Sequence, residues 1–136
     1  MKVFKCLLFI SFLGLSIIGF SQVTDVTGRI SIFSSKSKYG GVIKYVKGAY
    51  ITASFTTPAW SDDYGNFSLR FVGIDPRTAV HIKVTKDSFE VVNDFELERL
   101  VIGRLSPIQV FLAKKGELAQ AEIDLLQSRG VAERAI

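Results

Sequence analysis

The sequence predicts an all-β fold, a sandwich of about seven short strands with a short C-terminal helix. Most of the chain after residue 21 alternates apolar and polar residues with a period of two, which is typical of strands with one buried face. Clusters of Asp, Asn, Gly and Pro separate these segments, and such residues favour turns. Strands of this kind are not stable alone, so two sheets packed face to face would bury all of the apolar faces.

The first 21 residues have the layout of a secretory signal peptide. Lys2 and Lys5 form a short positive region, and residues 6–20 are an uncharged apolar run. This run is shorter than the roughly 20 residues that a membrane-spanning helix needs. We therefore expect cleavage ahead of Gln22 and export to the periplasm, the outer envelope or the medium, with no membrane span left after cleavage. An uncleaved membrane anchor is the alternative.

The composition of residues 22–136 fits one small domain. Two of the 17 Lys and Arg residues belong to the predicted signal peptide, so the rest of the chain is only weakly basic. A loose group of lysines between residues 36 and 47 is interpreted as a solvated loop, and no nucleic-acid partner is expected. The single cysteine, Cys6, would leave with the signal peptide, so the mature domain would have no disulfide and no thiolate metal site.

Six segments show the alternation, and they define the expected core. The segments are residues 26–32, 49–55, 66–71, 79–86, 89–92 and 107–113. Their apolar positions predict a core that contains Ile30, Ile51, Phe67, Leu69, Ile82, Val84 and Val110. In the second segment the same pattern also directs Ala53 and Phe55 inward, and in the fourth it directs His81 outward.

The connections between these segments carry residues that suit turns and loops. Residues 62–66 (Asp-Asp-Tyr-Gly-Asn) predict a turn in which Asp62 caps backbone amides and Gly65 takes a positive φ. A calcium loop is the alternative, but this stretch does not have the alternating oxygen ligands and the later Glu of such a loop. Residues 34–45 are expected to form an exposed loop or an extra hairpin. Residues 93–104 fit either a short helix or an irregular crossover.

The last part of the chain changes to a helical pattern. Residues 117–126 are rich in helix formers, and Arg129-Gly130 offers a stop. The residues that would share one apolar face are Leu118, Ala121, Leu125 and Leu126. An isolated helix shorter than about 12–15 residues is marginal in water, so this helix must dock to be stable. The stripe could lie on the sandwich or await helices outside this chain. Because the strand faces already cover one another, we favour the second and expect the tail after Lys115 to be mobile.

Few side chains indicate a binding or catalytic site. His81 is the only histidine, lies on a polar face and has no obvious Ser or Asp partner, so we interpret it as an exposed structural residue. No catalytic, cofactor-binding or metal-binding residues are predicted. Exposed aromatic rings offer apolar faces with polar tips, and Trp60, Tyr39 and Tyr45 are the candidate ligand contacts. For Trp60 we favour partial burial at the edge of the sandwich over a ligand contact.

Four short motifs resemble those of the carboxypeptidase regulatory-like domain, also called transthyretin-like or carboxypeptidase D regulatory-like. Residues 26–30 match its V-x-G-x-V strand, residues 48–51 its G-A-x-V/I strand, and residues 61–67 its T-D-x-x-G-x-F/Y turn. Residues 86–89 match its K-x-G-Y ending loosely. Ser88 stands where the family often has Gly, which argues against a positive φ at that position.

The resemblance implies an immunoglobulin-like or prealbumin-like sandwich without catalytic residues or cofactors. Such domains are appended to peptidases, outer-membrane transporters and surface proteins, and in exported Bacteroidetes proteins they precede a helical, often tetratricopeptide-type region. We therefore divide the chain into a signal peptide (1–21), a regulatory-like sandwich (22–115) and a helical tail (116–136), either truncated or independent. The expected function is a non-catalytic accessory module with a protein partner or envelope component. The alternative is a small carbohydrate- or peptide-binding protein that uses residues 34–47 and Trp60.

Overall fold

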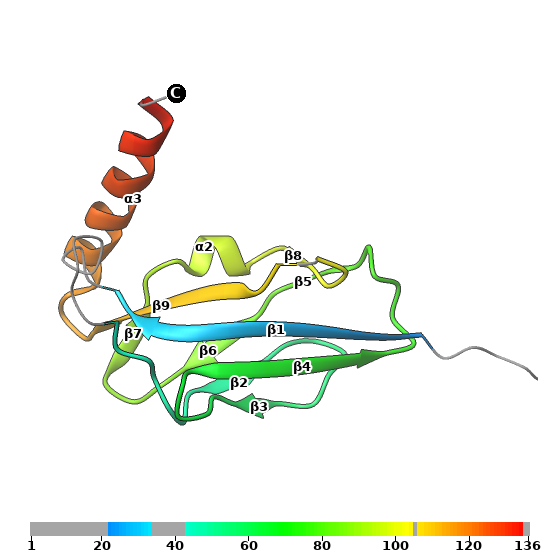
Figure 1. The fold of residues 1–136 in the computed structure, drawn as a ribbon. Coiled ribbons are helices and arrows are strands. Elements are labelled where there is room, and N and C mark those ends of the chain that lie inside the picture. Colours follow the sequence, from blue (N-terminus) through cyan, green and yellow to red (C-terminus); the bar gives the residue numbers. More distant parts are fainter. Residues whose placement is uncertain (1–21, 34–42, 105, 135–136) are drawn as a thin grey trace, which may run out of the picture.

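The computed structural model describes residues 22–33, 43–104 and 106–134. The predicted signal peptide and Tyr39 lie outside these ranges. Within them the chain forms nine strands and two helices. The fold is mostly β with a C-terminal helix, which confirms the predicted all-β sandwich (Figure 1).

The larger sheet has four strands in the order β4-β1-β9-β7. These strands are β1 (Val23–Ile32), β4 (Asn66–Val72), β7 (Phe89–Val91) and β9 (Ile108–Lys114). β1 runs antiparallel to β4 and parallel to β9, so the sheet is mixed, and β7 is antiparallel to β9. Figure 1 shows β1 as the long central strand between β4 and β9.

The remaining strands form two smaller sheets. A three-stranded antiparallel sheet has the order β3-β2-β6, with β2 (Tyr50–Thr52), β3 (Ala59–Trp60) and β6 (Lys83–Thr85). A two-stranded pair joins β5 (Ala79–Val80) to β8 (Leu100–Val101). Side chains from all three sheets meet in one hydrophobic core, so the smaller sheets together close the sandwich over the larger one.

The core contains the seven residues that were named for it. Ile30, Ile51, Phe67, Leu69, Ile82, Val84 and Val110 are each 7% exposed or less. Phe67 packs directly over Gly28, where an added Cβ would lie 2.3 Å from the Cζ atom of the ring. A side chain at position 28 would therefore displace Phe67 from the core, which explains why glycine suits the middle of β1.

Two predicted strands end or divide earlier than the alternation indicates. The segment 49–55 leaves the sheet after Thr52, and Phe55, predicted to point inward, is 66% exposed with a φ of 69°. The segment 79–86 divides at His81 into β5 and β6, which pair with different strands. Burial still alternates through both halves because the backbone stays extended while the pairing partner changes.

Two of the connections form tight turns. Asp62 Oδ1 accepts bonds from the backbone amides of Tyr64 and Asn66, each at 2.9 Å, and Gly65 takes a φ of 74°. These findings confirm the cap and the glycine conformation predicted for this turn. At the second turn Ser88 takes a φ of 69° although it is not glycine, so the expectation of a negative φ there is wrong. The amide of Phe89 closes this turn by donating to the carbonyl of Lys86 at 3.1 Å.

The stretch 93–104 holds both of the structures that its sequence left open. It begins with the short helix α2 (Asp94–Leu97) and continues as a crossover through β8. Asn93, which is fully buried, precedes the helix and donates from Nδ2 to the carbonyl of Gln109 at 2.7 Å. Its Oδ1 accepts the amide of Phe111 at 2.9 Å, so the side chain extends the β7–β9 ladder by one step.

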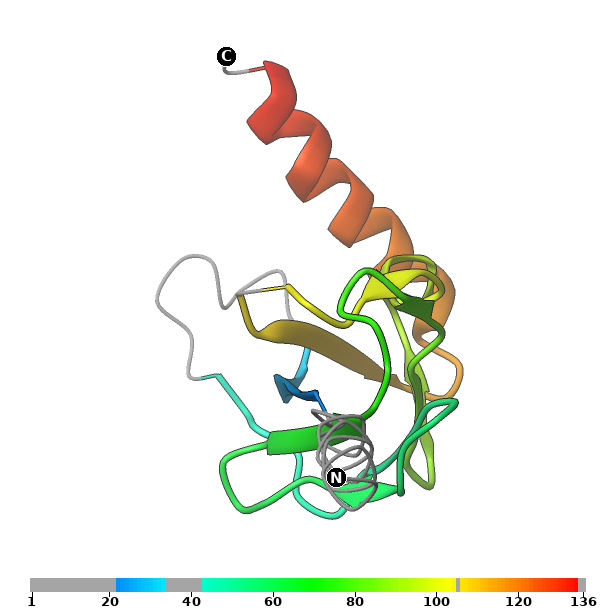
Figure 2. The same cartoon turned by 90° about the vertical axis from the view of Figure 1, so that its right-hand side faces the viewer.

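Helix α3 (Leu118–Arg134) is longer than predicted and continues through Gly130. Ala121 and Leu125 are buried against Val92 and Ala113, on the outer face of the four-stranded sheet. The expectation that this stripe has no surface on the sandwich is therefore wrong. Leu126, predicted on the same face, is 57% exposed. Figures 1 and 2 show the helix rising from the end of β9, with its C-terminal end directed away from the sheets.

The far half of α3 makes one further contact with the sandwich. Arg129 forms an ion pair with Glu96 of α2, and its guanidinium lies 6.0 Å from the ring centre of Phe95. Glu96 also accepts a bond from Asn93 Nδ2 at 3.0 Å. The helix is thus held to the sandwich in two ways. Ala121 and Leu125 pack on the sheet, and Arg129 is linked to the buried Asn93 through Glu96.

Candidate functional site

The strand register assembles a row of outward side chains on the three-stranded sheet and another on the four-stranded sheet. On the three-stranded sheet, Tyr50 lies opposite both Trp60 and Thr85, and we call these three residues the aromatic row. On the four-stranded sheet, Arg29 lies opposite Asn66 and Gln109, and we call these the polar row. Both rows belong to outer faces because the next residue along each strand points into the core.

The aromatic row presents an exposed indole that is braced by a second ring. The ring centres of Trp60 and Tyr50 are 4.7 Å apart with an interplanar angle of 51°. Trp60 lies on the edge strand β3 and is 65% exposed, whereas Tyr50 is only partly exposed. Cross-strand aromatic contacts of this kind hold both side chains in defined orientations. Partial burial of Trp60 at the edge of the sandwich is therefore not what the structure shows.

A hollow of about 570 Å³ lies beside the aromatic row. Its lining includes both rings of the pair together with Lys86, Asp87 and Lys115. Within the described part of the chain, neither of these two lysines forms an ion pair. The row therefore offers an apolar ring face next to charged groups that are available to a ligand.

A third lysine near this surface is already neutralised. Lys47 Nζ lies 2.8 Å from Asp63 Oδ1, with both side chains exposed. The hydrogen bond to Asp63 and the attraction of its carboxylate raise the pKa of Lys47. An exposed pair of this kind adds little to stability, but it removes one cation from those that a ligand could meet.

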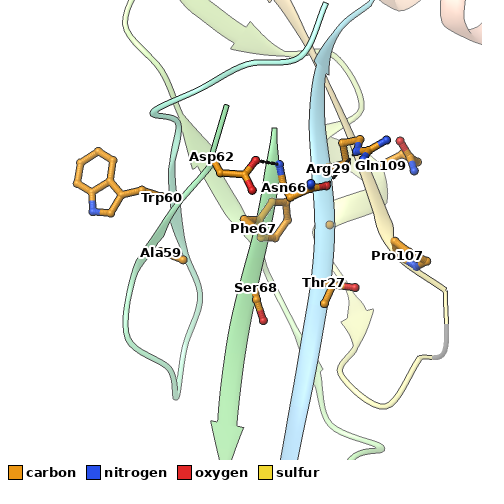
Figure 3. Close-up of a pocket in the computed structure, with 11 residues that line it drawn as sticks. Thr27, Arg29, Ala59, Trp60, Asp62, Asn66, Phe67, Ser68, Pro107 and Gln109 are labelled. Atoms are coloured by element: carbon orange, nitrogen blue, oxygen red, sulfur yellow. Dashed lines mark hydrogen bonds between the residues drawn. The ribbon is translucent and has the colours of Figure 1, made fainter. Parts of the chain in front are cut away.

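The polar row lies in a larger hollow of about 730 Å³ (Figure 3). Arg29 Nε donates to Asn66 Oδ1 at 2.9 Å, and Nη1 donates to the Tyr45 hydroxyl at 3.3 Å. The guanidinium carbon also lies 4.6 Å from the centre of the Tyr45 ring. Thr27 and Ser68, opposite each other in the neighbouring register position, add two hydroxyl groups to the lining.

The structure separates the aromatic residues that the sequence grouped together. Trp60 pairs with Tyr50, while Tyr45 contacts Arg29 on the other sheet. Tyr39 lies outside the described residues. Tyr64, on the turn, is 68% exposed and lines neither hollow. Trp60 also reaches the rim of the larger hollow, but Figure 3 shows its ring directed away from Arg29.

The one histidine lies at the surface, as the alternation predicts. His81 Nε2 is 3.6 Å from Asp94 Oδ1, and both side chains are substantially exposed. The expectation that His81 has no Asp partner is therefore wrong, because Asp94 was not apparent as a neighbour from the sequence. In the described part of the chain, no three His, Cys, Asp or Glu side chains gather as a metal site would require.

The sequence analysis did not identify Arg29 or Gln109 as site residues, and it treated Asn66 as a turn residue. Each is an outward residue of a strand that the alternation identifies, so the signal for exposure was present. Their convergence depends on β1 lying between β4 and β9, and the parallel pairing of β1 with β9 is not encoded in any local motif. Trp60 and Tyr50 face each other across the antiparallel strands β2 and β3, and the sequence did not fix the register of that pair.

Comparison of this chain with protein-family models, with curated proteins and with solved structures found no match. The helices that the structure describes include none that is both long and apolar enough to cross a membrane. The function must therefore be argued from the two rows themselves.

Proposed function

We propose that this protein is an exported, non-catalytic accessory module of an envelope or surface assembly, and that it acts by binding a partner through the aromatic row. Export follows from the signal-like residues 1–21, and the accessory role follows from the resemblance of residues 26–30, 48–51 and 61–67 to a regulatory-like domain. The sandwich fold agrees with that resemblance.

The observation that carries this proposal is the exposed, braced ring of Trp60. Tryptophan buries a large apolar area when a partner covers it, and it is enriched among the residues that dominate binding energies. Tyr50 restrains the indole at a ring-centre distance of 4.7 Å, so less side-chain entropy is lost on binding. A bare sheet face around the pair leaves room for a partner surface.

Binding of a carbohydrate or a peptide is the second candidate function. A sugar ring packs its apolar face against an exposed aromatic ring, while its hydroxyls need polar partners at the edge of that ring. Thr85 in the aromatic row and Lys86 and Asp87 in the hollow beside it supply such partners. A peptide would use the same ring as an anchor for an apolar side chain.

Glycan and peptide arrays probed with residues 22–136 test both candidates, with Trp60→Ala as the variant. We expect the best ligand of either array to lose at least about tenfold in affinity, because a central aromatic anchor contributes roughly 1.4 kcal/mol or more. Tyr64→Ala is the matched control, since this ring is equally exposed but lies in neither hollow, and its affinity should change less than about twofold.

Equal losses in the two variants would show that general surface aromaticity, and not the aromatic row, determines binding. Binding only to peptides or only to glycans would select between the two ligand classes. If neither array gives a ligand that depends on Trp60, the binding role of the aromatic row is wrong.

A further inference from the structure

We propose that the polar row is a second binding site, which accepts the anionic group of a hydroxyl-rich molecule such as an acidic saccharide. The site is centred on the four-stranded sheet, and Trp60 of the aromatic row reaches only its rim. It would bind a carboxylate or a sulfate through Arg29, and the hydroxyls around that group through the neighbouring amide and hydroxyl side chains.

Arg29 is held in place without a carboxylate partner. Asn66 Oδ1 accepts from Nε, and Tyr45 contacts the guanidinium through both its hydroxyl and its ring. These contacts orient the planar group but do not neutralise its charge. Arg70, on the same face, differs in this respect because its Nε lies 3.1 Å from Asp25 Oδ1. Of these two arginines, only Arg29 has no carboxylate partner among the described residues, so its charge is left for an oxyanion that approaches the Nη1–Nη2 edge.

The groups around Arg29 suit hydroxyls better than further charges. Thr27, Ser68 and Gln109 line the same hollow, and the described chain gives none of their side chains a hydrogen-bond partner. Short polar side chains and a planar amide can each donate and accept, which is what a ring of vicinal hydroxyls requires. A hollow of about 730 Å³ falls in the range of ordinary small-ligand sites.

The position of the one nearby carboxylate fixes where the anion would lie. Asp62 also lines the hollow, and its charge would repel an anionic group placed beside it. Figure 3 shows Asn66 between Asp62 and Arg29. The anion is therefore expected on the side of Arg29 that faces Gln109, with the rest of the ligand extending toward Thr27 and Ser68.

Isothermal titration calorimetry with four probes tests the proposal on residues 22–136. The probes are a uronate-bearing oligosaccharide, a sulfated oligosaccharide, a neutral oligosaccharide of the same length, and inorganic sulfate. We expect at least one acidic oligosaccharide to bind at least tenfold more tightly than the neutral one and than inorganic sulfate. The preferred anion, carboxylate or sulfate, is read from which acidic probe binds better.

Three variants identify the site. Arg29→Gln should weaken binding of the acidic probe at least tenfold, and Arg29→Lys should weaken it nearly as much because the bidentate fork is lost. Arg70→Gln removes a cation from the same sheet face and should change the affinity less than twofold. Thermal melts of all three variants identify any that fails to fold, and Arg29→Lys then decides the outcome because it retains the charge.

Several results would overturn the proposal. Equal binding of the neutral oligosaccharide, equal losses in the Arg29 and Arg70 variants, or no binding of any acidic probe at millimolar concentration would each do so. Inorganic sulfate that binds as tightly as the oligosaccharides would reduce the site to an ion site without a saccharide. Tyr50→Ala separates the two proposals, since Tyr50 belongs to the aromatic row but does not line the larger hollow, and this variant should leave the binding within twofold of the unaltered protein.

Discussion

The two outer faces of the sandwich carry different chemistry at equivalent positions. The polar row places a guanidinium between two amides across β4, β1 and β9, whereas the aromatic row places an indole beside a phenol across β3 and β2. In both rows the next residue inward belongs to the core, as Ile30 follows Arg29 and Ile51 follows Tyr50. Alternation therefore assigns side chains to a face, and strand pairing decides which chemistry that face assembles.

The two faces also differ in what covers them. Helix α3 packs on the outer face of the four-stranded sheet through Ala121 and Leu125, near the end of β9. The polar row lies toward the start of β9, where Gln109 pairs with Arg29, and so remains open. Among the described elements, none packs on the aromatic row, and Trp60 stays largely exposed.

The largest expected effect comes from the core that both rows share. Phe67→Ala should lower the free energy of unfolding by about 3–5 kcal/mol, because the ring is buried and fills the space over Gly28. His81→Ala, an exposed change on β-sheet surface, should cost under about 0.5 kcal/mol. Denaturant midpoints measure both values, and the reverse order would show that the strand register is wrong.

The sequence predicted whether a strand residue points inward or outward far better than it predicted which residues lie beside it on the neighbouring strands. All seven expected core residues are buried, because burial depends only on the period of the strand. Phe55 fails because the strand ends at Thr52, and a positive φ then turns the next residues out of the sheet. The division of residues 79–86 between two sheets was invisible because both halves keep the same alternation.

The candidate site was predicted only in part, because the sequence indicates exposure and local turns but not contacts between distant segments. Trp60 is exposed as a ligand contact requires, but its partner is Tyr50 and not Tyr45. The turn of Asp62 and Gly65 could be predicted because its hydrogen bonds are local. The bonds of Asn93 to β9 span 16 and 18 residues of sequence, and no local pattern encodes a contact at that range.

A smaller effect is expected from removing the contact by which helix α3 covers one end of the four-stranded sheet. Leu125→Ala should reduce the free energy of opening of the α3 amides by about 2 kcal/mol, near the lower limit for a buried leucine, because the cluster under the helix is small. Leu126→Ala is the matched control, since this neighbour is exposed, and should stay within about 0.5 kcal/mol.

Amide hydrogen exchange measures this difference residue by residue along α3. Protection near Leu125 comparable to that of β4 would show that the helix belongs to the folded domain. Fast exchange throughout α3 in the unaltered protein, with no response to Leu125→Ala, would instead restore the expectation of a mobile tail that awaits a partner.

The smallest expected effect concerns the aromatic row itself. A double-mutant cycle of Tyr50→Ala and Trp60→Ala should give a coupling of about 0.5–1.5 kcal/mol in the free energy of unfolding, because the rings are in contact across the strand pair. A cycle of Tyr64→Ala and Trp60→Ala should give less than about 0.3 kcal/mol, since these rings share no contact among the described residues. Denaturant unfolding of the four single and double variants measures both couplings. Equal couplings would mean that Tyr50 does not brace the indole, and the entropic advantage claimed for the exposed ring of Trp60 would then be lost.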